Sequence, residues 1–217
     1  MRNVLAALVG LMMVCVCLPA QEAEVAVYLK AGAEQPAAIV ELLQRESQAL
    51  LRPAGVKLVW RELREASRHE DFQAVVVARF EGSCTAARED PAREDVELAW
   101  AGRPAALAST PVQDGVILPF TTVNCGAVKR LTAALMRDEP GARRNYLFGR
   151  ALGRVLAHEL YHILGQTRLH ADKGIAKPAF HARELLAETF AFHEPAILVL
   201  RAGASDSVPA AAETTGR

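Results

Sequence analysis

The segment from Asn145 to Leu164 constrains the fold more than any other part of this sequence. It contains no proline, and residues 155–164 are apolar on nearly every side of the predicted helix. A helix that is apolar all round has to be buried. Two histidines and a glutamate nevertheless interrupt it, at His158, Glu159 and His162. We therefore expect a buried helix that carries three polar side chains, each of which needs a partner.

The spacing of these three residues indicates a metal site. His158 and His162 are four residues apart, about one helical turn, so their rings lie on the same face and can bind one metal ion. Glu159 is turned partly away from the metal, close enough to hold a water bound to it. The pattern H-E-x-x-H is typical of zinc hydrolases, in which the glutamate is the general base. The alternative is a partly exposed helix with ordinary histidines.

The third ligand has to come from further along the chain, because a catalytic zinc usually has three protein ligands and one open position. We predict His170 for this role. Gly165 can end the helix in a left-handed conformation and turn the chain back beneath the metal. Asp172, Glu184 and Glu188 are the alternatives, and the two glutamates lie one turn apart on a predicted last helix.

The segment from His158 to His170, H-E-L-Y-H-I-L-G-Q-T-R-L-H, resembles the extended zinc signature of metzincin peptidases, H-E-x-x-H-x-x-G-x-x-H. The first two histidines, the glutamate and Gly165 match this signature. The third histidine stands two positions later than in the family. The family's methionine turn is missing, since no methionine follows Met136, and residues 174–178 are expected in its place. With a glutamate as third ligand, the site would instead look like that of the glutamate-ligand zincins.

The resemblance implies a zinc-dependent peptidase that hydrolyses peptide bonds in peptide or protein substrates. Zn²⁺ held by His158, His162 and His170 would lower the pKa of its water to roughly 7. Glu159 would take a proton from that water and pass it to the leaving amine. In similar enzymes the strand before the active helix pairs with an extended peptide, and Val116–Phe120 is the candidate here.

Two other functions stay open. The protein could be a non-catalytic zinc-binding or interaction protein with a zincin-like fold, or a zinc amidase that acts on a non-peptide substrate. Glu159 speaks against a purely structural site, because structural zinc seldom keeps a spare carboxylate beside an open position.

The remaining sequence predicts an α+β fold of the zincin-like kind. We expect a twisted mixed sheet with a packed helix, followed by the long buried active-site helix and a C-terminal helix. The predicted strands are 25–29, 56–60, 72–80, 105–109 and 116–120. The predicted helices are 36–51, 127–136, 145–164 and 182–192.

The two ends of the chain have different compositions. Residues 1–20 have a positive start, an uncharged run from Val4 to Leu18 and small residues before Gln21, which is the layout of a secretory signal peptide. A retained anchor is the alternative, although a membrane span needs roughly twenty residues. We expect a metallopeptidase domain over 21–202 and a disordered tail over 203–217. The protein would be secreted or periplasmic, without stable membrane association after cleavage.

Cysteine content and charge complete these expectations. Signal cleavage would leave Cys84 and Cys125, which we expect to pair in an exported chain; two unrelated buried thiols are the alternative. Lys and Arg number 25, and Asp and Glu also number 25, so the net charge is zero. Nothing in this balance indicates nucleic acid as a partner.

Overall fold

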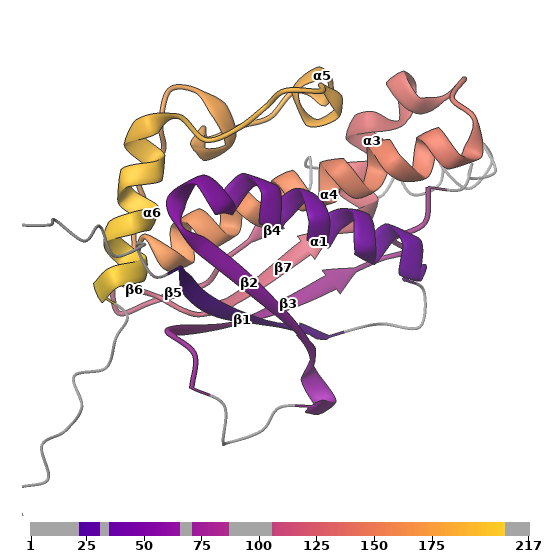
Figure 1. The fold of residues 1–217 in the computed structure, drawn as a ribbon. Coiled ribbons are helices and arrows are strands. Elements are labelled where there is room, and N and C mark those ends of the chain that lie inside the picture. Colours follow the sequence, from indigo (N-terminus) through magenta and orange to yellow (C-terminus); the bar gives the residue numbers. More distant parts are fainter. Residues whose placement is uncertain (1–21, 31–34, 66–70, 87–105, 207–217) are drawn as a thin grey trace, which may run out of the picture.

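The computed structural model of the 217-residue chain describes residues 22–30, 35–65, 71–86 and 106–206. The predicted signal peptide and residues 207–217 of the predicted tail lie outside these ranges. Within them the fold is mixed α/β, with a mixed sheet and several helices (Figure 1).

The main sheet has five strands in the order β2-β1-β3-β7-β4. The first four are parallel, and β4 pairs antiparallel with β7 at one edge. β3 lies between β1 and β7, which confirms that the apolar stretch predicted over 72–80 is a central strand. The strands are β1 (Ala23–Lys30), β2 (Val56–Glu62), β3 (Ala74–Glu81), β4 (Ala108–Ser109) and β7 (Phe120–Asn124).

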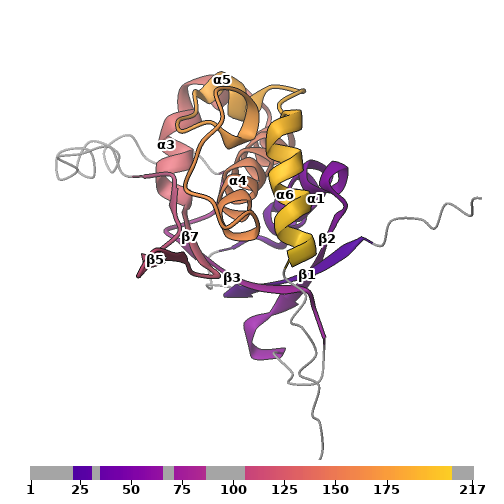
Figure 2. The ribbon, with the colours of Figure 1, turned by 90° about the vertical axis from the view of Figure 1, so that its left-hand side faces the viewer.

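The helices gather on one face of this sheet, as the two views in Figures 1 and 2 agree. Alternate residues of β1, namely Val25, Val27 and Leu29, belong to the hydrophobic core that the helices complete. The helices are α1 (Ala37–Leu51), α3 (Cys125–Met136), α4 (Gly141–Leu164), α5 (Ala182–Leu186) and α6 (Glu194–Asp206), and the short 3₁₀ turns include η3 (Gly174–Ala176).

The long helix predicted from the H-E-x-x-H segment is α4, and it begins at Gly141, four residues earlier than expected. It contacts α1, α3, α5, α6 and η3 as well as strands β4 and β7. Every residue from Leu147 to Tyr161 is buried. The expectation of a buried helix is therefore confirmed; His158 and Glu159 are buried with it, whereas His162 is half-buried.

The strand expected over Val116–Phe120 is wrong as a single element. Residues Val116–Ile117 form β6, which pairs with β5 (Val112–Gln113) in a small hairpin, whereas Phe120 begins β7. Asp114 and Gly115 turn this hairpin with positive φ angles of 51° and 83°. Pro119 then separates β6 from β7, because proline lacks the N–H that a continuous strand needs. The two edges of the main sheet are β2 and β4, and β4 is the one next to β7.

The C-terminal part also differs from the prediction. The helix expected over 182–192 ends at Leu186, and the chain forms a further helix, α6, which the prediction missed. Residues 203–206 of the predicted tail belong to α6. Leu200 and Ala204 are buried on its inner side, so this end is held by core contacts that its small-residue composition does not reveal.

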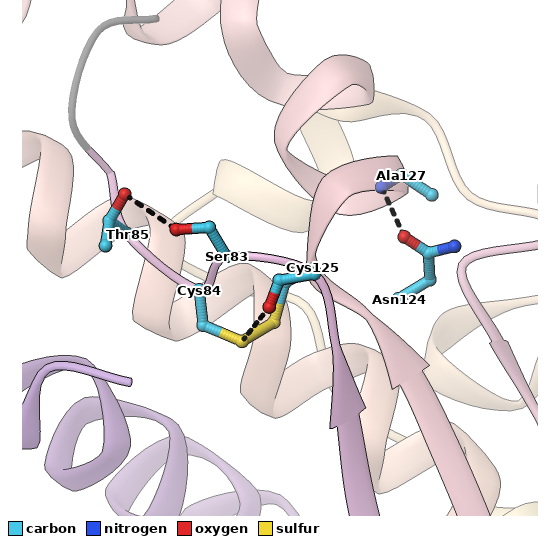
Figure 3. Close-up of a disulfide and its surroundings, with 7 residues drawn as sticks. Ser83, Cys84, Thr85, Asn124, Cys125 and Ala127 are labelled. Atoms are coloured by element: carbon cyan, nitrogen blue, oxygen red, sulfur yellow. Dashed lines mark hydrogen bonds between the residues drawn. A yellow bond between two sulfur atoms is a disulfide. The ribbon is translucent and has the colours of Figure 1, made fainter. Parts of the chain in front are cut away.

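Cys84 and Cys125 form a disulfide, as predicted, with their Cα atoms 5.1 Å apart. Figure 3 shows that the bridge joins the segment after β3 to the first turn of α3, where the Asn124 side chain accepts a hydrogen bond from the Ala127 amide at 2.8 Å. None of the helices in the described ranges has both the length and the apolar character that a membrane crossing requires.

Candidate metal centre

His158, His162 and His170 lie together at one side of α4. Their candidate ligand atoms are all within 4.8 Å of one another, and within the ranges that the structure describes this is the one group with the composition of a metal site. The first two histidines come from the last turns of α4 and the third from the segment that follows it. The structure thus brings together the three residues that the sequence predicted as ligands.

Backbone carbonyls decide which ring nitrogens of the two helical histidines are protonated. His158 Nδ1 donates to the Ile175 carbonyl at 2.7 Å, and His162 Nδ1 donates to the Thr167 carbonyl at 2.7 Å. A carbonyl oxygen only accepts, so each Nδ1 carries the hydrogen. A neutral ring in this tautomer presents a lone pair at Nε2, and the two Nε2 atoms lie 3.1 Å apart.

This arrangement tests whether a metal ion fits. Two nitrogen lone pairs that face each other at 3.1 Å repel unless a cation is shared between them. Two Zn–N bonds of about 2.0–2.1 Å at a tetrahedral angle would place their nitrogens about 3.3 Å apart. Burial lowers the pKa of His158 to about 4, which favours the neutral ring that binds metals. The residues fit a divalent metal; imidazole suits zinc, copper, iron and nickel.

His170 completes the group from a loop rather than from a helix. Its ring stacks on His158, with centroids 5.3 Å apart, and lies 4.8 Å from the ring of His162. The His170 side chain is exposed, so it lies on the solvent side of the group. Burial and the nearby His162 together lower the pKa of His170.

The turn that delivers His170 is not made as predicted. Gly165 has a φ of −80°, and the left-handed residue is Gln166, with φ 42°. The Gln166 side chain stabilises this turn by donating to the carbonyls of Ile163 and Ile117, at 2.8 and 3.2 Å. Gly165 is needed for close packing instead, because a Cβ there would lie 2.6 Å from Val199 of α6.

The alternative ligands do not join the group. Glu184 accepts two hydrogen bonds from Lys177 Nζ, at 2.6 and 2.7 Å, and one from the His181 amide. Burial alone would raise the pKa of Glu184, but these hydrogen bonds outweigh it and lower the pKa. Asp172 and Glu188 are exposed, and neither is among the residues that could share an ion.

Glu159 is buried beside the histidines, with 7% of its surface exposed. Its Oε2 accepts a hydrogen bond of 2.6 Å from the Thr110 hydroxyl. Burial raises the pKa of Glu159, although Thr110 and His162 oppose the shift. A carboxylate with a raised pKa is a better proton acceptor near neutral pH. Thr110 was missed by the sequence reasoning, because only the folding of β4 brings it across 49 residues to Glu159.

A cleft of about 600 Å³ opens over these residues. One wall is the edge segment 106–110, which includes β4, and a second is the chain from Pro178 to Phe180. The ring of Phe180 lies 5.3 Å from that of His158. The segment 174–178, expected in the place of a methionine turn, lies against His158 through the Ile175 carbonyl.

No protein-family model matches the chain, and a search of curated proteins finds no match. The functional argument therefore rests on the site and its surroundings.

Proposed function

We propose that this protein is a secreted zinc-dependent metallopeptidase with a zincin-like fold, similar in its site to the metzincins. One observation carries the proposal. His158, which is buried, and His162, which is half-buried, point their Nε2 atoms at each other across 3.1 Å, and a buried carboxylate lies next to them at the floor of an open cleft. A structural zinc site is closed by its ligands, whereas a catalytic site keeps a position open to substrate.

His158, His162 and His170 would hold the zinc ion. When bound, zinc supplies Lewis-acid chemistry, polarising a carbonyl and lowering the pKa of water. Glu159 would accept a proton from the attacking water and return it to the leaving nitrogen. The Thr110 hydroxyl holds Oε2 of Glu159, which leaves Oε1 for the proton.

The edge strand supports a peptide as the substrate. β4 pairs with β7 on one side and is the last strand of the sheet in the described part of the chain. Its residues line the cleft, so an extended peptide could add to this edge by main-chain hydrogen bonds while one of its carbonyls reaches the metal. This role was predicted for Val116–Phe120, and we now assign it to β4. The buried disulfide supports export, because such bonds persist in oxidising compartments.

The test is cleavage of an unbiased peptide mixture by the zinc-loaded protein, compared with Glu159→Gln. The substitution removes the proton acceptor and keeps the three histidines, so we expect bound zinc to be retained and the rate to fall about 10²–10⁴-fold. Glu188→Gln is the matched control, since it neutralises an exposed carboxylate outside the site, and its rate should equal that of the wild type. If the wild type binds zinc and cuts no peptide, the peptidase function is wrong. Screening non-peptide amides would then separate an amidase from a non-catalytic zinc-binding protein.

A further inference from the structure

Four polar residues lie at four-residue intervals along α4: Arg150, Arg154, His158 and His162. At this spacing they share one side of the helix, in successive turns. Arg154 is only 1% exposed and Arg150 only 8%. The buried guanidinium groups of Arg150 and Arg154 therefore lie on the same side of α4 as the two histidines, nearer the start of the helix.

Both arginines bind the end of α5. Arg154 Nη1 donates to the carbonyls of Glu184 and Leu185, at 2.7 and 3.1 Å. Arg150 Nη1 donates to the carbonyls of Leu186 and Ala187, at 3.3 and 2.7 Å. The last carbonyls of a helix have no partner within it, and cations near a helix C-terminus are favourable. These contacts also account for the end of α5 at Leu186, because side chains take the carbonyls that a longer helix would use.

A carboxylate from α1 fixes the inner arginine. Glu46 Oε1 accepts from Arg154 Nε at 2.7 Å, and its other oxygen lies 4.0 Å from Arg150 Nε. The close approach of α1 depends on Gly153, since a Cβ there would lie 2.7 Å from Glu46 Cβ. Arg154 thus joins α1, α4 and α5 through one planar group, which a lysine cannot reproduce.

The segment held in this way also carries the hydrogen-bond partner of His158. Within it, Lys177 bonds to Glu184 at 2.6 Å, which links α5 to η3. The Ala176 carbonyl accepts from the Ala171 amide at 2.9 Å. Between Ala176 and Gly174 stands Ile175, whose carbonyl fixes the ring of His158. A shift of α5 therefore moves the group that orients a metal ligand.

We propose that Arg154, held by Glu46, is a positioning residue of the metal centre: it locks α5 against α4 so that the Ile175 carbonyl meets His158 Nδ1. This inference rests on the proposed function for the identity of the centre. It assigns a role to a charged pair in which the hydrogen bonds of Arg154 go to Glu46 and to carbonyls of α5.

The experiment uses Arg154→Lys, which keeps the charge beside Glu46 and loses the planar fork. Zinc dissociation constants are measured by chelator competition. Amide hydrogen exchange over residues 171–187 is measured in the metal-free protein. We expect about tenfold or greater weakening of zinc binding, the range found when outer partners of ligands are removed, and faster exchange in this segment.

Arg144→Lys is the matched control. Arg144 also lies on α4 and donates to two carbonyls, those of Ala86 at 3.0 Å and Glu139 at 2.9 Å, both away from residues 171–187. It should leave zinc affinity and the exchange of this segment unchanged. Equal loss in both lysine variants would overturn the proposal, since the effect would then be one of general stability.

The remaining outcomes are also decisive. Wild-type affinity and exchange in Arg154→Lys overturn the proposal. If Arg154→Lys does not fold, Glu46→Gln replaces it; this variant keeps an acceptor and removes the charge, and it should change both measurements by a smaller factor. No change in Glu46→Gln overturns the role of the pair. If the wild type binds no metal, the proposed function fails, while the hydrogen exchange of the metal-free protein still decides whether Arg154 locks the segment.

Discussion

The polar side chains in the two halves of α4 have different kinds of partner. In the arginine half, the Nη1 atoms of Arg150 and Arg154 reach carbonyls of α5, and Glu46 supplies the counter-charge. In the histidine half, each ring has one nitrogen fixed by a carbonyl and the other directed at its neighbour, 3.1 Å away. Buried polar groups normally find partners within the protein. The histidine nitrogens instead converge on one point, which is the arrangement that could hold a metal ion.

The difference between the two halves of α4 requires that metal binding depend on the histidines. Zinc at about 1,000 times its dissociation constant should raise the free energy of unfolding of the wild type by about 4 kcal/mol. In His158→Ala this increase should vanish, because a ligand atom is lost. Urea unfolding with and without zinc measures it. His193→Ala removes an exposed histidine outside the group and should keep the full increase. Undiminished stabilisation of His158→Ala would place the metal elsewhere.

Two substitutions decide whether His170 or Glu184 is the third metal ligand. His170→Ala should weaken zinc binding by about a hundredfold or more, beyond the usual effect of outer partners, because His170 contributes a ligand atom. Glu184→Gln should weaken zinc binding by no more than about tenfold, because Glu184 acts on the centre only through Lys177 and η3 and contributes no ligand atom. Competition with a metal indicator measures both. The opposite ranking would make Glu184 the ligand and the site that of a glutamate-ligand zincin.

Substitution of Gly174 tests whether zinc binding depends on the position of the Ile175 carbonyl that bonds to His158. It has a φ of 70°, and a Cβ there would lie 2.3 Å from the Ala191 carbonyl oxygen. Gly174→Ala should cost about 1–3 kcal/mol of folding stability and also weaken zinc binding. Gly55→Ala is the control, because Gly55 has a φ of 75° and no atom within 4 Å of such a Cβ. Its smaller cost should come without a change in affinity. Equal costs and equal affinities would mean that the close approach is unimportant.

The sequence predicted best where one local pattern settles the structure. The apolar segment around His158 and His162 predicted the buried helix that forms, and its spacing placed on one face two histidines that could hold a metal ion. The β-branched and aromatic content of residues 25–29 and the apolar run over 72–80 identified two strands of the sheet. The disulfide followed from there being two cysteines left to pair.

The rest depends on contacts between distant segments. Thr110 reaches Glu159 only through the sheet, and its own neighbours carry no sign of that contact. The early end of α5 is caused by arginines about 30 residues before it, so the local sequence favours a longer helix than the one that forms. The left-handed turn at Gln166 was assigned to Gly165, because the packing of Val199 against Gly165 cannot be read from residues 165–170.

The disulfide constrains the part of the cleft that would bind substrate and not the part that would bind metal. Cys84 and Cys125 close a covalent ring that contains β4, Thr110 and the β5–β6 hairpin, whereas α4 and His170 lie after it in the chain. One wall of the cleft is thus inside the ring, and the floor with its three histidines is outside. A reductant should loosen the wall that would receive a peptide and leave the ligands in place. In a reducing compartment the protein would then keep its metal ion and lose its capacity to bind substrate.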